Sequence, residues 1–226
     1  MKQQVYVHEW DGYHSVLKNR MAMKIQYIIL LLFILIGHAN GKITPPSFLN
    51  TLNEPMEYVK VFPYNHCWGI IFLNEAEILK LVLGKKRVIR IEHFGSTSIP
   101  GMSAKPIVDI IIGLNKFYLD GNEIEKLLNL GYNFIENSHY CQRFYLQKRG
   151  DISINLSITK YKSETWKDCL SVRDYLKTHP VSMRKYATIK NEAIEKGFYS
   201  IDKYSAYKQF FFKHLVKNAR DWWCND

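Results

Sequence analysis

The chain has 226 residues, 47% of them apolar and 14% aromatic, which is enough to bury a core of ordinary domain size. This composition excludes an intrinsically disordered chain, and no internal repeat is visible. Residues 57–226 carry 26 Lys and Arg against 18 Asp and Glu, so the formal charge of +8 belongs to the domain itself. A basic domain favours anionic partners, but its basic residues are scattered rather than clustered. This pattern is typical of a solvated basic surface and argues against nucleic acid as the partner.

The N-terminal part of the chain divides into three segments. Residues 1–20 are polar, and we assign them no role. Residues 21–41 contain an apolar run over 25–37 that follows basic side chains and precedes small residues at signal-peptidase spacing, which is typical of a secretory signal. The run is shorter than the roughly 20 residues that span a bilayer, so a signal peptide or short anchor is favoured over a transmembrane helix. Residues 42–56 contain three prolines and no periodicity, and we interpret them as a linker.

Two other interpretations of the apolar segment stay open. It could form a helix that packs on the domain, or it could come from a displaced start codon. We therefore predict an exported or N-terminally anchored protein if residues 21–41 act as a signal, with membrane contact only through residues 25–37.

Residues 57–219 have the pattern of one α+β domain, and residues 220–226 are assigned to a C-terminal tail. Runs rich in β-branched and aromatic residues predict strands over 57–63, 88–94, 106–114, 132–135, 140–147 and 152–159. Apolar residues at helical spacing predict helices over 65–83, 120–130, 164–176, 181–195 and 201–219. We expect a small mixed β-sheet with flanking helices, an antiparallel extension formed by the last three strands, and a C-terminal helical bundle.

One acidic residue interrupts the strand predicted over 106–114. The rest of this run is almost continuously apolar, which is typical of a strand that is buried on both faces. A buried carboxylate is costly unless a cation or hydrogen-bond donors compensate it. We therefore expect Asp109 to contact a metal ion, a Lys or Arg side chain, or backbone N–H groups.

The loop before this strand is built from small and hydroxylated residues. Gly95 would let a ligand approach the backbone closely. Three hydroxyl side chains that can bond phosphate oxygens or cap a short helix belong to Ser96, Thr97 and Ser98. Lys105 stands just before the strand, where its ammonium group could neutralise a phosphate or Asp109. The loop therefore predicts a phosphate-binding turn.

The stretch IEHFGSTSIPGMSAKPIVDIIIGL, residues 91–114, resembles the signature of the GrpB family, which belongs to the nucleotidyltransferase superfamily. Four later segments resemble further blocks of the family in the same order: RFYLQK, VRDYLKTHP, YATIKNEAIEKG and YSAYKQFF. The resemblance extends over residues 57–218. It implies a nucleotidyltransferase-like core in which a Gly-Ser turn holds nucleotide phosphates and a carboxylate on the next strand holds Mg²⁺. It also implies a cytoplasmic protein, which is what we expect if residues 21–41 do not act as a signal.

This resemblance implies roles for several charged residues. Asp109 would hold Mg²⁺, and Lys105 would neutralise phosphate charge during nucleotidyl transfer. Lys190 and Lys208, which lie in the resembling helical blocks, would reach the phosphates from across a cleft.

Three other charged residues are ambiguous. Glu92 adjoins the turn and is the second candidate metal ligand, although an acid at the end of a strand is more often structural. Arg143 stands on an otherwise apolar strand, so it needs an anion, which could be Asp109, a phosphate or a surface Glu. Arg173 is expected to lock its helix to the sheet.

Three positions depart from the expected patterns. Ile111 stands where the wider superfamily has a second metal-binding acid, and Asn155 and Ser157 replace the histidines of an H-L-H triplet that is common in the family. Neither Asn nor Ser titrates near pH 7. Two functions therefore stay open: a Mg²⁺-dependent nucleotidyltransferase, or a non-catalytic module that binds a nucleotide or a coenzyme A-related molecule. The second ligand class is considered because GrpB-like domains are fused to dephospho-CoA kinase in some organisms.

Overall fold

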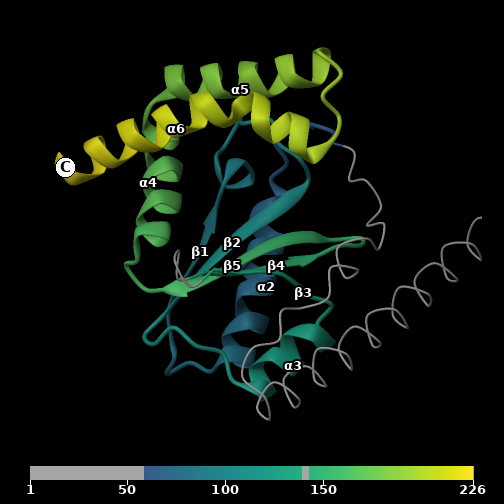
Figure 1. Ribbon diagram of the computed structural model, residues 1–226, viewed down its shortest axis with the longest axis vertical. Helices are drawn as coiled ribbons and strands as arrows, with labels where there is room; N and C mark the ends of the chain where they lie inside the picture. Colours follow the sequence, from purple (N-terminus) through teal and green to yellow (C-terminus); the bar gives the residue numbers. More distant parts are fainter. Residues whose placement is uncertain (1–58, 139–142, 226) are drawn as a thin grey trace, which may run out of the picture. The chain divides into compact units, whose positions relative to one another are not determined.

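A computed structural model describes residues 59–138 and 143–225 (Figure 1). The N-terminal extension, the signal-like segment and the linker, residues 1–56, lie outside the described residues, so what the sequence predicts for them stays a prediction. Within the described ranges, no helix combines the length and the apolar character that crossing a membrane requires.

In the described part of the chain, five strands form one mixed sheet in the order β1-β2-β5-β4-β3. The strands span Val88–Phe94 (β1), Ile107–Leu114 (β2), Asn133–Ser138 (β3), Arg143–Lys148 (β4) and Ser153–Lys160 (β5). β2 and β5 are parallel, whereas the other neighbouring pairs are antiparallel. The expected antiparallel extension is confirmed for β5, β4 and β3. The parallel pairing of β2 with β5 places Asn155 directly beside Asp109.

Helices cover both faces of this sheet (Figure 1). They span Cys67–Leu83 (α2), Gly121–Asn129 (α3), Glu164–Thr178 (α4), Pro180–Glu195 (α5) and Ile201–Asn225 (α6). α4, α5 and α6 pack against one another, and Figure 1 shows α5 and α6 side by side. The expected α+β class, with a mixed sheet and a C-terminal helical bundle, is confirmed.

The two faces of the sheet differ because successive side chains of a strand point to opposite sides. Alternate residues of β2 enter the main core against α2 and α3, and these are Val108, Ile110, Ile112 and Leu114. Asp109 and Ile111 therefore point to the other face. There, Ile111 packs against Trp166 and Leu170 of α4. Asp109 thus lies on the face that the C-terminal helices approach.

The strand expected over 57–63 is wrong for the residues that the structure describes. They form a single β-bridge, in which the N–H groups of Phe62 and Ala104 each donate to the other's carbonyl oxygen, at 2.8 and 2.9 Å. Pro63 follows immediately and has no N–H group with which to continue a ladder.

The predicted C-terminal tail is also wrong, because α6 continues to Asn225. Arg220 forms ion pairs with Asp168 and Glu164 of α4, and the ring of Trp222 packs edge-on against Tyr175. These contacts with α4 give the last turns of α6 a packing partner that the local sequence does not reveal.

Arg173 joins α4 to β1. Its Nη1 atom donates to Glu92 Oε2 at 2.7 Å and to the carbonyl oxygen of His93 at 3.1 Å, while its Nε atom donates to Asp174. Glu92 also accepts a hydrogen bond from Arg90 at 2.8 Å. Burial favours a raised pKa for Glu92, but the bonds from Arg90 and Arg173 outweigh it and hold the pKa below its usual value. The expected lock between helix and sheet is confirmed for Arg173.

We predict that Arg173→Ala lowers the free energy of unfolding by about 2–3 kcal/mol, because it removes a guanidinium donor from two half-buried carboxylates, those of Glu92 and Asp174. Arg90→Ala is the matched control, since Arg90 binds the same Glu92 from a side chain that is 64% exposed. Its effect on the free energy of unfolding should be much smaller, because an exposed ion pair contributes little to stability. Urea unfolding of both variants measures the difference, and equal losses would contradict the lock.

Candidate functional site

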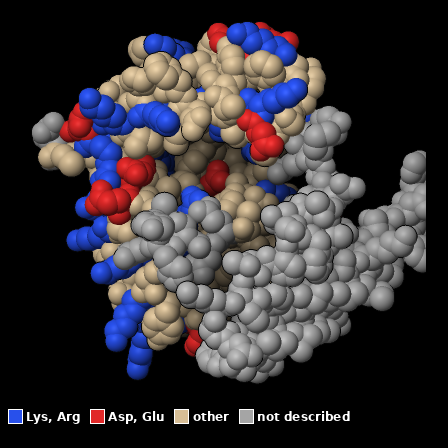
Figure 2. Space-filling view, viewed as in Figure 1, with Lys and Arg blue, Asp and Glu red and all other residues tan. Residues whose placement is uncertain are grey.

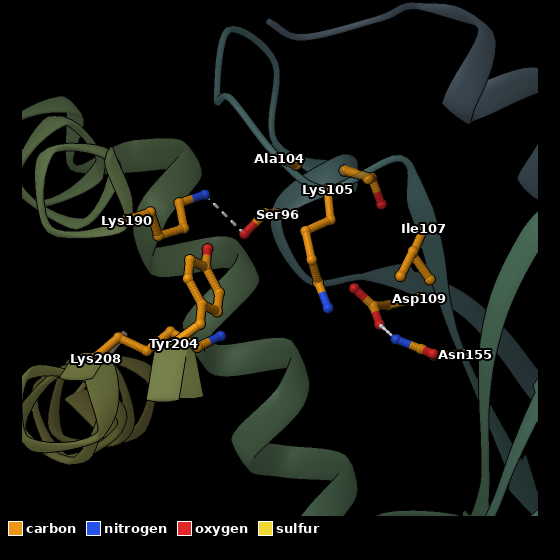
Figure 3. Close-up of a pocket in the computed structure, with 10 residues that line it drawn as sticks. Ser96, Ala104, Lys105, Ile107, Asp109, Asn155, Lys190, Tyr204 and Lys208 are labelled. Carbon is orange, nitrogen blue, oxygen red and sulfur yellow. Dashed lines mark hydrogen bonds between the residues drawn. The ribbon is translucent and has the colours of Figure 1, made fainter. Parts of the chain in front are cut away.

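A cavity of about 150 Å³ opens between the sheet and the last two helices. Figure 2 shows the surface hollowed, with acidic and basic side chains in and around the hollow. The polar side chains that line the cavity include Ser96, Lys105, Asp109, Asn155, Lys190 and Lys208 (Figure 3). Segments that are far apart in the sequence therefore meet at one site.

The turn after β1 is shaped by a contact between Gly95 and Asp109. Gly95 has a φ of +67°, and a Cβ atom built on it would lie 2.3 Å from Asp109 Oδ2 and 2.9 Å from Asp109 Cγ. The group that requires glycine here is therefore the Asp109 carboxyl group. The approach of a ligand phosphate to the backbone at Gly95 stays a prediction, and the glycine does not by itself support it.

The three hydroxyl groups of the turn have different surroundings. Ser98 Oγ donates to the Gly95 carbonyl oxygen at 2.7 Å and so closes the turn, and Thr97 Oγ1 lies 3.0 Å from His93 Nε2. Ser96 lines the cavity, and its Oγ accepts a hydrogen bond from Lys190 Nζ at 3.1 Å. Ser96 and Thr97 both line the cavity, but Thr97 is 1% exposed whereas Ser96 is partly exposed, so Ser96 is the more accessible of the two hydroxyl groups.

Asp109 is held by a side-chain amide, a partner that the sequence does not suggest. Asn155 Nδ2 donates to Asp109 Oδ1 at 2.8 Å, and Arg149 Nη2 donates to Asn155 Oδ1 at 2.9 Å. Burial raises the pKa of Asp109, while the bond from Asn155 and the charges of Lys105 and Lys208 lower it; burial dominates, so the pKa lies above its ordinary value. The chain Arg149–Asn155–Asp109 therefore fixes the carboxyl group in one orientation.

Three lysines line the same cavity as this carboxyl group, and Figure 3 shows Lys190 directed at Ser96. Lys105 comes from the segment before β2, whereas Lys190 and Lys208 come from α5 and α6. Lys190 is only 2% exposed, and burial, assisted by the charge of Lys208, lowers its pKa to about 7, although Asp109 opposes this shift. Burial and the charge of Lys105 also lower the pKa of Lys208.

The charges around the cavity suit an anionic ligand. Among the described residues that line it, three amines stand against one carboxyl group. Burial and neighbouring positive charges destabilise the protonated form of a lysine. An anion that enters between such lysines stabilises their protonated forms again. Ammonium groups on flexible stems can follow the oxygens of a phosphate group.

The same residues do not suit a Mg²⁺ ion that is held by protein side chains. Glu92, the expected second ligand, accepts hydrogen bonds from Arg90 and Arg173 instead. The described ranges contain no group of three His, Cys, Asp or Glu side chains placed to hold a metal ion. Asp109 faces ammonium groups, which would repel a cation.

Arg143 lies elsewhere on this face of the sheet. It pairs with Thr159 on β5, four residues from Asn155 and so roughly 13 Å along the strand. Its guanidinium carbon lies 5.1 Å from the centre of the Tyr145 ring. Arg143 is not among the described residues that line the cavity, but its charge and that of Asp109 both act on Tyr145 and on Cys169, so a role for Arg143 beside Asp109 stays a prediction. The arginine that is bonded to the site is Arg149, through Asn155.

The comparisons with known proteins agree on one family. The family model described as GrpB protein matches residues 58–218. The UPF0157 protein YqkA of Bacillus subtilis is 32% identical over 169 residues, which is 74% of this chain and 49% of the relative, so the chain spans about half of that protein. Glutamate-rich protein GrpB of Alkalihalophilus pseudofirmus is 30% identical over 61% of this chain and 81% of its own length. The crystal structure of conserved protein GrpB from Enterococcus faecalis superposes with a TM-score of 0.64 at 28% identity, covering 73% of this chain and 99% of that one.

We predict that Gly95→Ala lowers the free energy of unfolding by about 3 kcal/mol, because strain at positive φ adds to the clash with Asp109. Gly101→Ala is the control, since Gly101 has a φ of +78° but nothing within 4 Å of the position that a Cβ atom would take. It should cost only the strain of about 1 kcal/mol. Thermal or urea unfolding should be measured for Gly95→Ala in the wild-type protein and in the Asp109→Ala variant. The loss of stability caused by Gly95→Ala should be smaller in the Asp109→Ala variant, because the clashing carboxyl group is absent there. An undiminished cost there would contradict the contact.

Proposed function

The chain belongs to the GrpB family, and we propose that its domain binds the phosphate groups of a small molecule, such as a nucleotide or a coenzyme A-related compound, in the cavity beside Asp109. The observation that carries this proposal is the lining of three lysines and one carboxyl group around about 150 Å³. Such a cavity is large enough for phosphate groups, whereas the rest of a nucleotide would have to extend beyond it.

The three lysines would have different roles in binding the anion. Lys105 and Lys208 approach from the sheet and from α6, so a phosphate between them would contact cations on two sides (Figure 3). Lys190 stands behind Ser96, where it orients the hydroxyl group toward the cavity. Ser96 would then donate a charge-assisted hydrogen bond to a phosphate oxygen.

We propose ligand binding rather than metal-dependent nucleotidyl transfer as the primary activity. Binding is preferred over metal-dependent transfer because few metal ligands are at hand in the described part of the chain. The cavity has a single carboxyl group among the described lining residues, and Glu92 is bound to two arginines. Phosphate recognition by lysines and a hydroxyl group requires no metal ion held by the protein.

The phosphate site makes a prediction for titrations with ADP, ATP, pyrophosphate and coenzyme A, each in EDTA and in Mg²⁺. Lys105→Met and Lys208→Met should each weaken the tightest of these ligands about tenfold, or about 1.4 kcal/mol, because each removes one ammonium group from the anion. Lys203→Met is the control, since Lys203 lies on α6 but outside the cavity lining. Calorimetry should show binding in EDTA.

Two results would contradict the proposal. Affinities that are unchanged in both lysine variants would remove the anion site, and binding that occurs only with Mg²⁺ would return Asp109 to the role of metal ligand. The ligand series also distinguishes a nucleotide from a coenzyme A-related ligand. The two classes share their phosphate groups and differ in the rest of the molecule, so their affinities should differ.

Lys190 makes the binding pH-dependent. The pKa of Lys190 is about 7 in the folded protein, below the ordinary value of 10.5. Between pH 7 and 10.5 this amine is therefore mostly protonated in the unfolded chain and mostly uncharged in the folded one. The contribution of Lys190 to the free energy of unfolding consequently grows as pH rises through this window. A bound anion favours the protonated amine, so affinity should fall as pH rises from 7 to 9. Calorimetry at pH 8 in buffers of different ionisation enthalpy should detect proton uptake on binding, and Lys190→Met should abolish it. Equal heats in all buffers would contradict the prediction.

A further inference from the structure

We propose that Ser96 and Lys190 form a nucleophile–base pair that makes this cavity reactive toward esters and thioesters. Lys190 Nζ lies 3.1 Å from Ser96 Oγ, within hydrogen-bond reach. A serine hydroxyl group is a weak nucleophile until a neighbouring base accepts its proton, and lysine serves as that base in Ser–Lys catalytic pairs.

The base is fixed by a third group. Lys190 Nζ also donates to the carbonyl oxygen of Ser103, which lies between the turn and β2. Two anchors therefore hold an amine that comes from α5, 94 residues away from Ser96 in the sequence. A nucleophile, a base within reach of it, and a group that orients the base are three of the parts that such a site requires.

The pair is also placed correctly relative to the cavity (Figure 3). Lys190 is 2% exposed, whereas Ser96 is partly exposed and lines the open space. The proton acceptor is thus shielded from water behind the hydroxyl group, and the hydroxyl oxygen faces the space that a substrate would occupy.

For Lys190 to accept a proton, its amine must be uncharged. The groups that face it are Lys208 and Tyr204 on α6, Asp109 on β2, and the Tyr186 ring on its own helix, whose centre is 5.0 Å from Nζ. Burial and Lys208 lower the pKa to about 7 against the opposing effect of Asp109. At pH 8 the amine is therefore mostly uncharged. It can then donate one N–H to Ser103 and accept the Ser96 proton with its lone pair.

The reaction balances as an acyl transfer to Ser96 followed by hydrolysis. Ser96 Oγ attacks the acyl carbon while Lys190 Nζ takes its proton; the C–O or C–S bond then breaks, and the leaving alcohol or thiol receives that proton. A water molecule next attacks the acyl-serine, Lys190 takes the water proton and returns it to Ser96 Oγ, and a carboxylic acid leaves. The net reaction consumes one ester or thioester and one water molecule.

The charge of the cavity narrows the substrate class. Lys105 and Lys208 would hold an anionic group on the acyl or leaving part, so the expected substrate is an ester or thioester that carries a phosphate or carboxylate. Because a bound anion favours the protonated amine of Lys190, such a substrate should react at a higher pH than an uncharged one. This refinement rests on the proposed function, whereas the Ser96–Lys190 pair itself does not.

An uncharged alkyl fluorophosphonate tests the pair directly in the full chain. Attack by Ser96 Oγ forms an O–P bond and expels fluoride while Lys190 takes the proton, so intact-mass and peptide analysis at pH 8 should show one adduct on Ser96. Ser96→Ala should give no adduct at this turn, and Lys190→Met should label at least 100-fold more slowly. Lys203→Met should label at the wild-type rate.

A second measurement needs no variant at the buried position. The labelling rate of the wild-type chain should rise with pH and level off with a midpoint near 7, as Lys190 loses its proton. Wild-type protein that forms no Ser96 adduct, a folded Lys190→Met variant that labels at the wild-type rate, or a rate that is flat between pH 6 and 8 would each overturn the proposal. Because the probe is uncharged, these results are independent of whether Lys105 and Lys208 bind phosphate.

Discussion

The contact between the Asp109 carboxyl group and the backbone of Gly95 is the constraint on which the site depends. The carboxyl group fills the space that any larger residue would need for its Cβ atom, so with Asp109 in place the turn after β1 requires glycine at position 95. That turn presents Ser96 to the cavity, while Ile99 and Met102, just beyond it, are buried against the C-terminal helices. One local contact on the sheet therefore determines where the hydroxyl group lies and how the helical bundle is attached.

The buried charges of the cavity are stable only as a group. Asp109 alone would be costly at this depth, and so would Lys190. However, Asp109 lowers the cost of the charge on Lys190, while Asn155, Lys105 and Lys208 lower the cost of the charge on Asp109. The compensation is incomplete, because the described lining residues hold more amines than carboxyl groups. A fold that needed only stability would be better served by apolar residues at these positions, so the excess of amines over carboxyl groups in the lining is itself an argument for a ligand.

The sequence predicts the local parts of this site and misses the parts that depend on distant pairing. The strands around the turn are predictable because their β-branched runs are local signals, and Asp109 is predictable because it interrupts one of them. Asn155 stands out in the sequence only as a departure from a family pattern, since its role exists only once β5 lies parallel to β2. The assignment of Glu92 to a metal fails for the same reason, because the approach of Arg173 from α4 decides its partners. Lys190 and Lys208 are indicated by the family resemblance, as helical periodicity alone marks them as surface residues.

The origin of the cavity lining suggests how a ligand would act on the fold. Asp109, Asn155 and Lys105 belong to the sheet or adjoin it, whereas Lys190 and Lys208 belong to α5 and α6. These helices pack in clusters separate from the main core, around Tyr186 and Leu215 and around Ala193 and Tyr204. An anion held from both sides would therefore tie the two helices to the sheet, through charges that otherwise repel one another. Ligand binding would then stabilise the packing of α5 and α6 against the sheet, because a ligand stabilises the conformation in which its site is complete.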